Sequence, residues 1–170
     1  KSHYRKRREE VTRFNEASRT ELRGLAMTGV KFGISFTTSF LNQGNAIVNV
    51  YRDGTIQVWT GATEMGQGVK TSLPMVIAEQ LEVNWKEVVI EQAGLNQAAF
   101  GGTQGAGGSN STPTDYEPFH LIGATARTML VDAAAQTWGV PAGECRAENA
   151  TVFHQASGRS LKYGELVAKA

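Results

Sequence analysis

This 170-residue chain has one cysteine, four prolines and no long run of apolar side chains. The lone Cys145 excludes a disulfide scaffold and a metal site built from several thiolates, because both need several sulfurs at fixed spacings. No stretch approaches the roughly 18 to 20 apolar residues of a membrane span, and the first residues lack the apolar core of a signal peptide. These absences predict no membrane partner and a cytoplasmic location. A periplasmic location would need a signal in a segment before Lys1.

The charges nearly cancel, but they are unevenly distributed. The 17 Lys and Arg residues face 16 Asp and Glu residues, and a formal net charge of +1 argues against nucleic acid as a general partner. Residues 1–24 nevertheless contain eight basic and four acidic side chains, whereas the remainder contains nine basic and twelve acidic ones. Because the first residues show neither an initiator methionine nor a targeting pattern, we expect a segment of a longer chain.

Hydrophobic spacing predicts a leading helix followed by strands. Residues 3–17 place Tyr4, Val11 and Phe14 on one stripe, which is typical of an amphipathic helix with a solvated basic face. Residues 24–36 alternate weakly and are rich in Val, Ile and Phe, which favours a strand. Two alternating runs, at 46–51 and 55–60, flank an Asp-Gly pair, and this pattern predicts a β-hairpin.

Helical spacing is more frequent in the second half. The apolar positions of residues 69–81 predict a helix, with Pro74 tolerated near its start. The further expected elements are a strand at 86–92, a long helix from Asp115 or Glu117 to Trp138, a hairpin pairing 151–154 with 160–163, and a short helix at 164–170. Strands and helices mix without strict βαβ alternation, so the predicted fold class is α+β, a mixed sheet with helices packed on it in two layers.

Two glycine-rich places depart from what an ordinary core or loop needs. The first is the 61–68 turn, Gly-Ala-Thr-Glu-Met-Gly-Gln-Gly, between a predicted strand and a predicted helix. Glycines at a helix start let backbone N–H groups approach an anion, and the helix dipole favours negative charge there. The turn lacks the Lys-Ser/Thr of a phosphate-binding Walker loop and the third glycine of a dinucleotide fingerprint. The alternative interpretation is a simple Gly-rich helix cap.

The second place is an uncharged stretch of 23 residues, 92–114, that contains six glycines. Its densest part is the 105–112 segment, Gly-Ala-Gly-Gly-Ser-Asn-Ser-Thr, just before the long helix. Backbone amides and hydroxyl groups of this kind can surround a polar cofactor, although the composition also fits a disordered loop. Because both Gly-rich places open helices, they could direct two helix starts at one ligand.

Other candidates for chemistry are weak, and no catalytic residue is assigned. His3, His120 and His154 are far apart and have no metal-ligand spacing, so we expect no metal held by protein side chains. Cys145 lacks a Cys-x-x-Cys partner. Glu64 is the one carboxylate inside a Gly-rich turn, and a glutamate near a helix start can equally be a cap.

With its 61–68 turn the sequence resembles a known family, the molybdenum hydroxylases typified by xanthine dehydrogenase and aldehyde oxidase. Residues 25–37, Leu41-Asn-Gln43, the 51–55 hairpin turn and the 61–68 turn occur in the same order as in the molybdopterin-binding subunit or domain of xanthine dehydrogenases. The later half is more similar to the isoquinoline-oxidoreductase and bacterial aldehyde dehydrogenase branch. The resemblance covers the whole chain and implies one cofactor-binding domain, divided into a leading helix (1–20), strands with Gly-rich cofactor turns (22–114), and a long helix with a small hairpin (115–170).

The resemblance also implies which residues touch the cofactor. In the family, the Met-Gly-Gln-Gly turn and the later Gly-Gly-Ser segment line the molybdopterin. The corresponding positions here are Met65, Gly66, Gln67, Gly68, Gly107, Gly108, Ser109 and Ser111. The family holds molybdenum through the sulfur atoms of the pterin, so no protein metal ligand is expected.

The implied activity is oxidation of a purine, an aldehyde or an N-heterocycle, with water as the oxygen source. The family's catalytic glutamate follows a Gly-Val-Gly-Glu motif, which does not occur here, so we expect this chain to be inactive alone. Its expected partners are the rest of the molybdenum subunit, iron-sulfur domains or subunits, FAD domains or subunits in some members, and a small-molecule substrate. The alternative is a non-catalytic anion- or nucleotide-binding module that uses the same helix starts.

Overall fold

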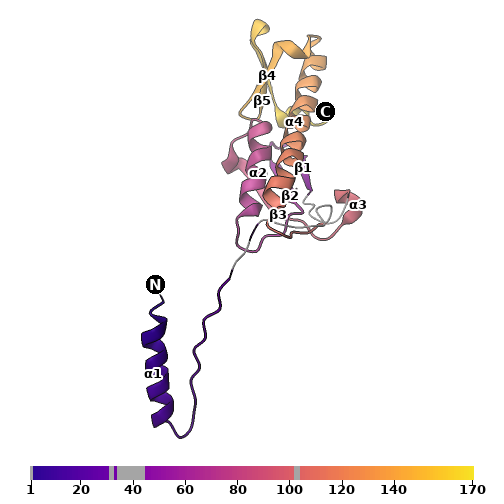
Figure 1. The fold of residues 1–170 in the computed structure, drawn as a ribbon. Helices are drawn as coiled ribbons and strands as arrows, with labels where there is room; N and C mark the ends of the chain where they lie inside the picture. The colour runs from indigo at the N-terminus through magenta and orange to yellow at the C-terminus, as the bar shows by residue number, and fades with distance from the viewer. Residues whose placement is uncertain (1, 31–32, 34–44, 102–103) are drawn as a thin grey trace. The chain divides into compact units, whose positions relative to one another are not determined.

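A computed structural model describes residues 2–30, 33, 45–101 and 104–170. The chain divides into two compact units, Lys1–Gly33 and Ile34–Ala170, each of which is described by itself (Figure 1). The expected sequence motif at Leu41-Asn-Gln43 and the second part of the predicted strand at 24–36 lie outside the described residues, apart from Gly33.

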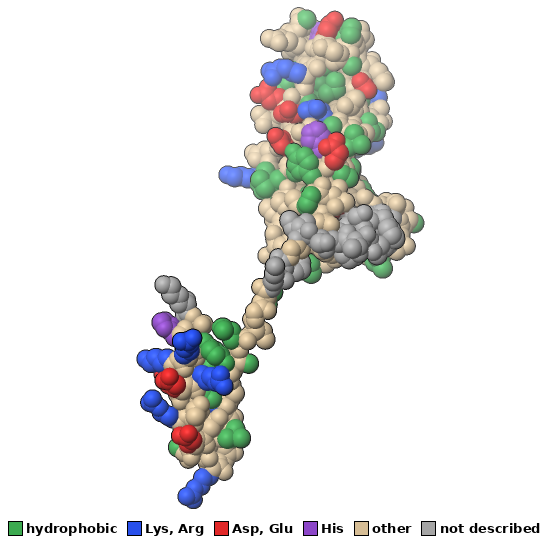
Figure 2. Space-filling model, viewed as in Figure 1, with side chains coloured by type: hydrophobic (Ala, Val, Ile, Leu, Met, Phe, Trp, Pro, Cys, Tyr) green, Lys and Arg blue, Asp and Glu red, His purple; other side chains and the backbone are tan. Residues whose placement is uncertain are grey.

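The first unit is built on one helix, α1 (Tyr4–Ala17), as the hydrophobic spacing predicts. Tyr4, Val11 and Phe14 are its half-buried apolar residues, and its Lys and Arg side chains lie on the surface (Figure 2). The chain then folds back along the helix, because the Asn15 carboxamide accepts from the Arg23 amide at 2.8 Å and donates to the Arg23 carbonyl at 2.9 Å. The Arg23 guanidinium lies 3.6 Å from the centre of the Phe14 ring.

The strand predicted at 24–36 is wrong for its first seven residues. Residues 24–30 have no regular secondary structure. A strand needs a hydrogen-bonded neighbouring strand, whereas the chain entering this stretch satisfies its backbone through the side chain of Asn15 instead. Weak alternation alone was therefore insufficient to specify a strand here.

The second unit contains a three-stranded mixed sheet with helices on one face. Strand β1 (Ala46–Val50) pairs antiparallel with β2 (Ile56–Thr60), and β2 pairs parallel with β3 (Val88–Gln92). This confirms the hairpin that the Asp-Gly pair predicts. Helices α2 (Val69–Gln80) and α4 (Ser111–Trp138) pack side by side on the sheet (Figure 1). The two-layer α+β prediction is confirmed.

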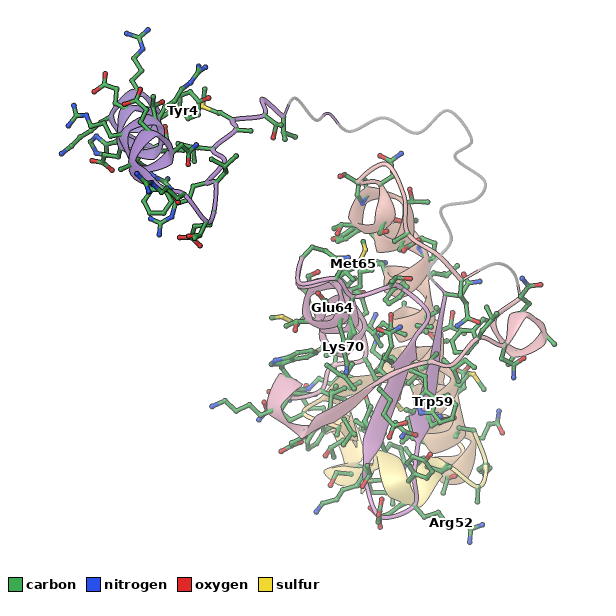
Figure 3. All side chains as sticks on the ribbon, turned by 90° about the horizontal axis from the view of Figure 1, so that it is seen from below. Tyr4, Arg52, Trp59, Glu64, Met65 and Lys70 are labelled. Carbon is green, nitrogen blue, oxygen red and sulfur yellow. The ribbon has the colours of Figure 1, made fainter. Side chains whose placement is uncertain are left out.

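The core lies between the helices and the sheet. One buried cluster joins the strand residue Val58 to Leu73 and Ile77 of α2 and Phe119 of α4. On the opposite face of β2, the Trp59 side chain retains 37% of its exposure (Figure 3). This alternation along β2 is what a sheet covered on one face requires.

A second, antiparallel sheet of β4 (Cys145–Glu148), β5 (Thr151–His154) and β6 (Arg159–Lys162) follows α4. Short helices complete the unit: α3 (Gln97–Phe100), α5 (Tyr163–Leu166) and the 3-10 turns η2 (Trp85–Glu87), η3 (Ala142–Glu144) and η4 (Gln155–Ser157). The predicted hairpin is confirmed, but β4, a strand of four residues of which two are charged, was not predicted. The predicted C-terminal helix is shorter, and α4 begins about one turn before Asp115.

Candidate functional site

The two Gly-rich places lie at the same end of the second unit. Strands β2 and β3 are parallel, so the 61–68 turn and the uncharged stretch after Gln92 both leave the same edge of the sheet. Helices α2 and α4 also run in the same direction. Val69 at the start of α2 shares a cluster with Phe119, and Leu81 after its end shares another with Leu130. Ligands of α/β sheets bind outside the carboxyl ends of parallel strands, which makes this edge the candidate site.

The 61–68 turn is organised around the Glu64 carboxylate. Its Oε1 accepts hydrogen bonds from the amides of Gly66 at 2.6 Å and Gly68 at 3.1 Å, and its Oε2 accepts from the Lys70 amide at 2.9 Å. The amide of Lys70, followed by those of Gly68, Gly66 and Gln67, holds the pKa of Glu64 below its ordinary value. The cap interpretation of this glutamate is therefore confirmed.

Gln67 closes the same turn with its side chain. Its Oε1 accepts from the Met65 amide at 2.6 Å, and its Nε2 donates to the Thr63 carbonyl at 2.8 Å. A carboxamide carries two N–H hydrogens and two acceptor lone pairs, so each end retains capacity for one further hydrogen bond. Residues 65–68 are all exposed. The turn therefore presents an ordered, uncharged surface.

The 105–112 segment forms a tight turn at the start of α4. Gly108 and Ser109 both have positive φ, 56° and 60°, and the Asn110 amide donates to the Gly107 carbonyl at 3.2 Å. Glycine adopts this left-handed conformation without the steric cost that other residues pay. Helix α4 starts with no hydrogen bond from the Asn110 side chain and no acidic residue in its first turn. Its start thus differs from that of α2.

Amide side chains that sequence reasoning missed hold these loops together. Gln104 donates to the Gly94 carbonyl at 3.1 Å and accepts from the Asn96 amide at 2.6 Å. Gln92 donates to the carbonyl oxygens of Thr60 and Ala62, each at 3.0 Å. The signal that could have found Gln92 is its position as the last residue of a predicted strand.

The two Gly-rich places meet at Gly61, where the backbone is closely packed against neighbouring residues. A Cβ atom at Gly61 would lie 3.0 Å from the Asn45 carbonyl oxygen and 3.1 Å from Cγ of Gln104. The Asn45 side chain in turn donates a hydrogen bond to the carbonyl of Phe100. Gly61 is therefore the point where the 61–68 turn meets the loop that leads to the 105–112 segment.

Cys145 and His154 belong to the second sheet, which follows the C-terminal end of α4. His154 is buried in the second sheet, with Nδ1 2.7 Å from Ser157 Oγ and Nε2 3.1 Å from Glu144 Oε2. Burial raises the pKa of the Cys145 thiol. Among the described residues, no group of three or more His, Cys, Asp or Glu side chains is placed to hold a metal ion. No helix in the described part of the chain is long and apolar enough to cross a membrane.

Comparison with known proteins identifies the family. A family model described as "Molybdopterin cofactor-binding domain" matches residues 1–170. The chain belongs to this family. The molybdopterin cofactor-binding domain described here also has sequence relatives among oxidoreductases. The beta subunit of isoquinoline 1-oxidoreductase from Brevundimonas diminuta is 39% identical over 129 residues, which cover 73% of this chain and 16% of that subunit.

One further sequence relative and one solved structure are also similar to this chain. Xanthine dehydrogenase from Emericella nidulans is 43% identical over 98 residues, 58% of this chain and 7% of that protein. A solved structure of Cu,Mo-CO dehydrogenase superposes with a TM-score of 0.60 at 21% identity, and covers 74% of this chain and 16% of that one. The structural likeness supports the fold. The chain thus spans less than a fifth of the length of each of these relatives.

The two Gly-rich turns fit a bulky polar cofactor of the kind this domain family binds. Gly66 and Gly68 have positive φ, 98° and 84°, and a Cβ atom at either would meet nothing within 4 Å. The backbone at these positions therefore faces open space. Hydroxyl groups of Ser109 and Ser111 and the Gln67 carboxamide add uncharged donors and acceptors at the same edge of the sheet.

Proposed function

We propose that this chain supplies part of the molybdopterin site of a molybdenum hydroxylase that oxidises a purine, an aldehyde or an N-heterocycle with water as the oxygen source. The observation that carries the proposal is the placement of two Gly-rich turns at one edge of the sheet, at the starts of two helices that run in the same direction. The family membership of the chain supports molybdopterin as the cofactor, and the relatives, an isoquinoline 1-oxidoreductase subunit and a xanthine dehydrogenase, support an oxidation reaction.

The cofactor contacts in this proposal come from both turns. Met65, Gly66, Gln67 and Gly68 contribute backbone groups and one carboxamide. Gly107, Gly108, Ser109 and Ser111 contribute backbone groups and two hydroxyls. When bound, the cofactor supplies the molybdenum and the sulfur atoms that hold it, and the protein supplies orientation and hydrogen bonds.

The remaining catalytic parts belong to other segments or subunits in this proposal. These parts are the general base, the iron-sulfur clusters, FAD where the enzyme uses it, and the substrate pocket. Glu144, the carboxylate in a superficially similar Gly-Val-Pro-Ala-Gly-Glu run, contacts His154 in the second sheet rather than the candidate site. This supports the view that the chain alone is inactive and that it works only in an assembled enzyme.

The alternative, a non-catalytic anion- or nucleotide-binding module, loses support at α2. The amides that would receive the anion at that helix start already donate to Glu64. The molybdopterin proposal does not need these amides, because the exposed faces of Gln67 and the 105–112 segment remain available.

The proposal is tested by cofactor content in the assembled protein that contains this chain. Gln67→Ala and Ser109→Gly should each lower bound molybdenum and pterin several-fold, since each loses polar groups of the site. Glycine is chosen at Ser109 because it keeps the positive φ while it removes the hydroxyl. Gln155→Ala, on an exposed residue of η4, is the matched control and should retain full content. Full molybdenum and pterin occupancy in both site variants would contradict the assignment.

A further inference from the structure

Glu64 is the only charged residue of the 61–68 turn. We propose that Glu64 is a positioning residue for the cofactor site: its carboxylate acts as an internal anion that orders the turn before the cofactor arrives and excludes external phosphate from the start of α2. This inference deepens the proposed function and rests on it for the cofactor, although its first three tests need no cofactor.

The geometry places one carboxylate where a helix cap or a bound anion would otherwise lie. Glu64 precedes α2 by five residues, and its two oxygens receive the amides of Gly66, Gly68 and Lys70. The helix has no side-chain cap from Gly68 and no acidic residue in its first turn. Glu64 therefore satisfies, from outside the helix, amides that a helix start leaves without a backbone acceptor.

The negative charge of the Glu64 carboxylate disfavours binding of another anion at the start of α2. The same amides lower the pKa of Glu64, so its carboxylate is ionised at neutral pH. The positive end of the helix dipole favours that charge. A phosphate group approaching this position would have to displace a carboxylate joined covalently to the turn, and it would meet like charge until it did so.

Glu64 affects the cofactor site by fixing the backbone around Gln67. Two of the amides that Glu64 holds, those of Gly66 and Gly68, flank Gln67 directly in the sequence. With the backbone fixed on both sides, the Gln67 side chain bonds to Met65 and Thr63 and keeps one orientation. Glu64 thereby presents Gln67 as a pre-ordered neutral contact, and a pre-ordered site loses less entropy when a ligand binds.

The first test measures the turn in cofactor-free protein, made in a host that cannot synthesise molybdopterin. Hydrogen exchange of the Gly66, Gly68 and Lys70 amides should be roughly tenfold faster in Glu64→Ala, with Glu64→Gln in between because its carboxamide keeps one acceptor oxygen. Glu79→Gln removes an exposed carboxylate from the other end of the same helix and should change none of these rates. Unchanged exchange in Glu64→Ala would overturn the proposal.

The second test is the pH dependence of amide protection, which shows whether Glu64 acts through its negative charge. Because the folded-state pKa of Glu64 is lowered, its contribution is present at neutral pH and is lost as the pH falls through that lowered pKa, on the acid side of an ordinary glutamate. After correction for intrinsic exchange, the protection of the three amides should fall over that range in the native protein and in Glu79→Gln. In Glu64→Gln the protection should be lower and should not titrate. A titration that persists in Glu64→Gln would assign the effect to another group.

A titration with inorganic phosphate tests the exclusion. In cofactor-free Glu64→Ala, phosphate should shift the NMR signals of the Gly66–Lys70 amides, because the start of α2 is then open to an anion. The same concentrations should leave these signals unchanged in the native protein. Equal shifts in both proteins would show that Glu64 does not guard the position.

The fourth test measures whether the order of the 61–68 turn affects the binding of the cofactor. In protein made with molybdopterin synthesis intact, Glu64→Ala and Glu64→Gln should hold several-fold less molybdenum and pterin than the native protein and Glu79→Gln. If the native protein itself holds neither, the proposed function fails while the exchange and phosphate results still decide the role of Glu64 in the turn. If the native protein is loaded and both Glu64 variants load equally well, the positioning role fails alone.

Discussion

Gly123 of α4 lies directly against the backbone of Ile77 in α2: a Cβ atom at Gly123 would come within 2.7 Å of the Ile77 carbonyl oxygen and 3.1 Å of its Cα. Only a glycine permits so close an approach without a shift of one helix. The contact fixes how α2 and α4 pack side by side, and both helices begin at the candidate site. The contact between Gly123 and Ile77 thus determines how the two Gly-rich turns at the starts of these helices are positioned relative to each other.

Replacement of Gly123 should separate the two helices. We expect Gly123→Ala to lower the free energy of unfolding by about 1–3 kcal/mol, because the overpacking outweighs the better helix propensity of alanine. Gly143→Ala, where a Cβ atom would meet nothing within 4 Å, is the control and should be near neutral. Hydrogen exchange of the α2 and α4 amides in the full-length protein measures the effect. Native-like protection in Gly123→Ala would show that the helices adjust without cost.

The Tyr163 hydroxyl should stabilise the junction between α5 and the end of α2. This buried hydroxyl donates to the Leu81 carbonyl at 2.8 Å, so Tyr163→Phe leaves a buried acceptor without its partner and should cost about 1–3 kcal/mol. Tyr51→Phe is the matched control, because the Tyr51 hydroxyl bonds the Gln57 side chain at 2.8 Å at an exposed position and should contribute little. Urea unfolding of both variants would test the difference.

Tyr163 also predicts a dependence of stability on alkaline pH. Burial raises the pKa of its phenol above the ordinary value, so the unfolded chain releases this proton at a lower pH than the folded chain. The contribution is fully present below about pH 10 and is lost as the pH rises above it. The native protein should therefore lose stability more steeply above pH 10 than Tyr163→Phe does. Equal slopes in the two proteins would contradict the burial argument.

The contact of Gly61 with Gln104 should couple the two turns. Gly61→Ala places a methyl group 3.1 Å from Cγ of Gln104 and should displace that side chain, which releases the Asn96 amide. We expect faster hydrogen exchange at Asn96 in cofactor-free protein and several-fold lower cofactor content in the loaded enzyme. Gly94→Ala, in the same loop but with open space around it, should change neither. A Gly61→Ala variant with a protected Asn96 amide would show that the turns are independent.

The sequence predicted those parts of the fold whose signals are local. The Asp-Gly pair between alternating runs predicts the β1–β2 hairpin, and the spacing of apolar residues predicts α2 and α4. Prediction failed where strand pairing, rather than the pattern of apolar residues, decides the structure. Residues 24–30 lack a strand, and β4 pairs with β5 despite the charges along it. The family resemblance, which rests on the order of several motifs, is confirmed by the family model.

For the candidate site, the sequence shows which residues are available: two Gly-rich turns, one glutamate inside the first, and hydroxyl groups in the second. Tertiary structure alone decided that both turns leave the same edge of a sheet, because strand direction and helix packing bring together residues some forty positions apart in the chain. It also decided that the start of α2 is filled by Glu64 while α4 starts without an acidic residue in its first turn. Composition cannot show this difference, because it depends on which amides a carboxylate reaches once the backbone has turned.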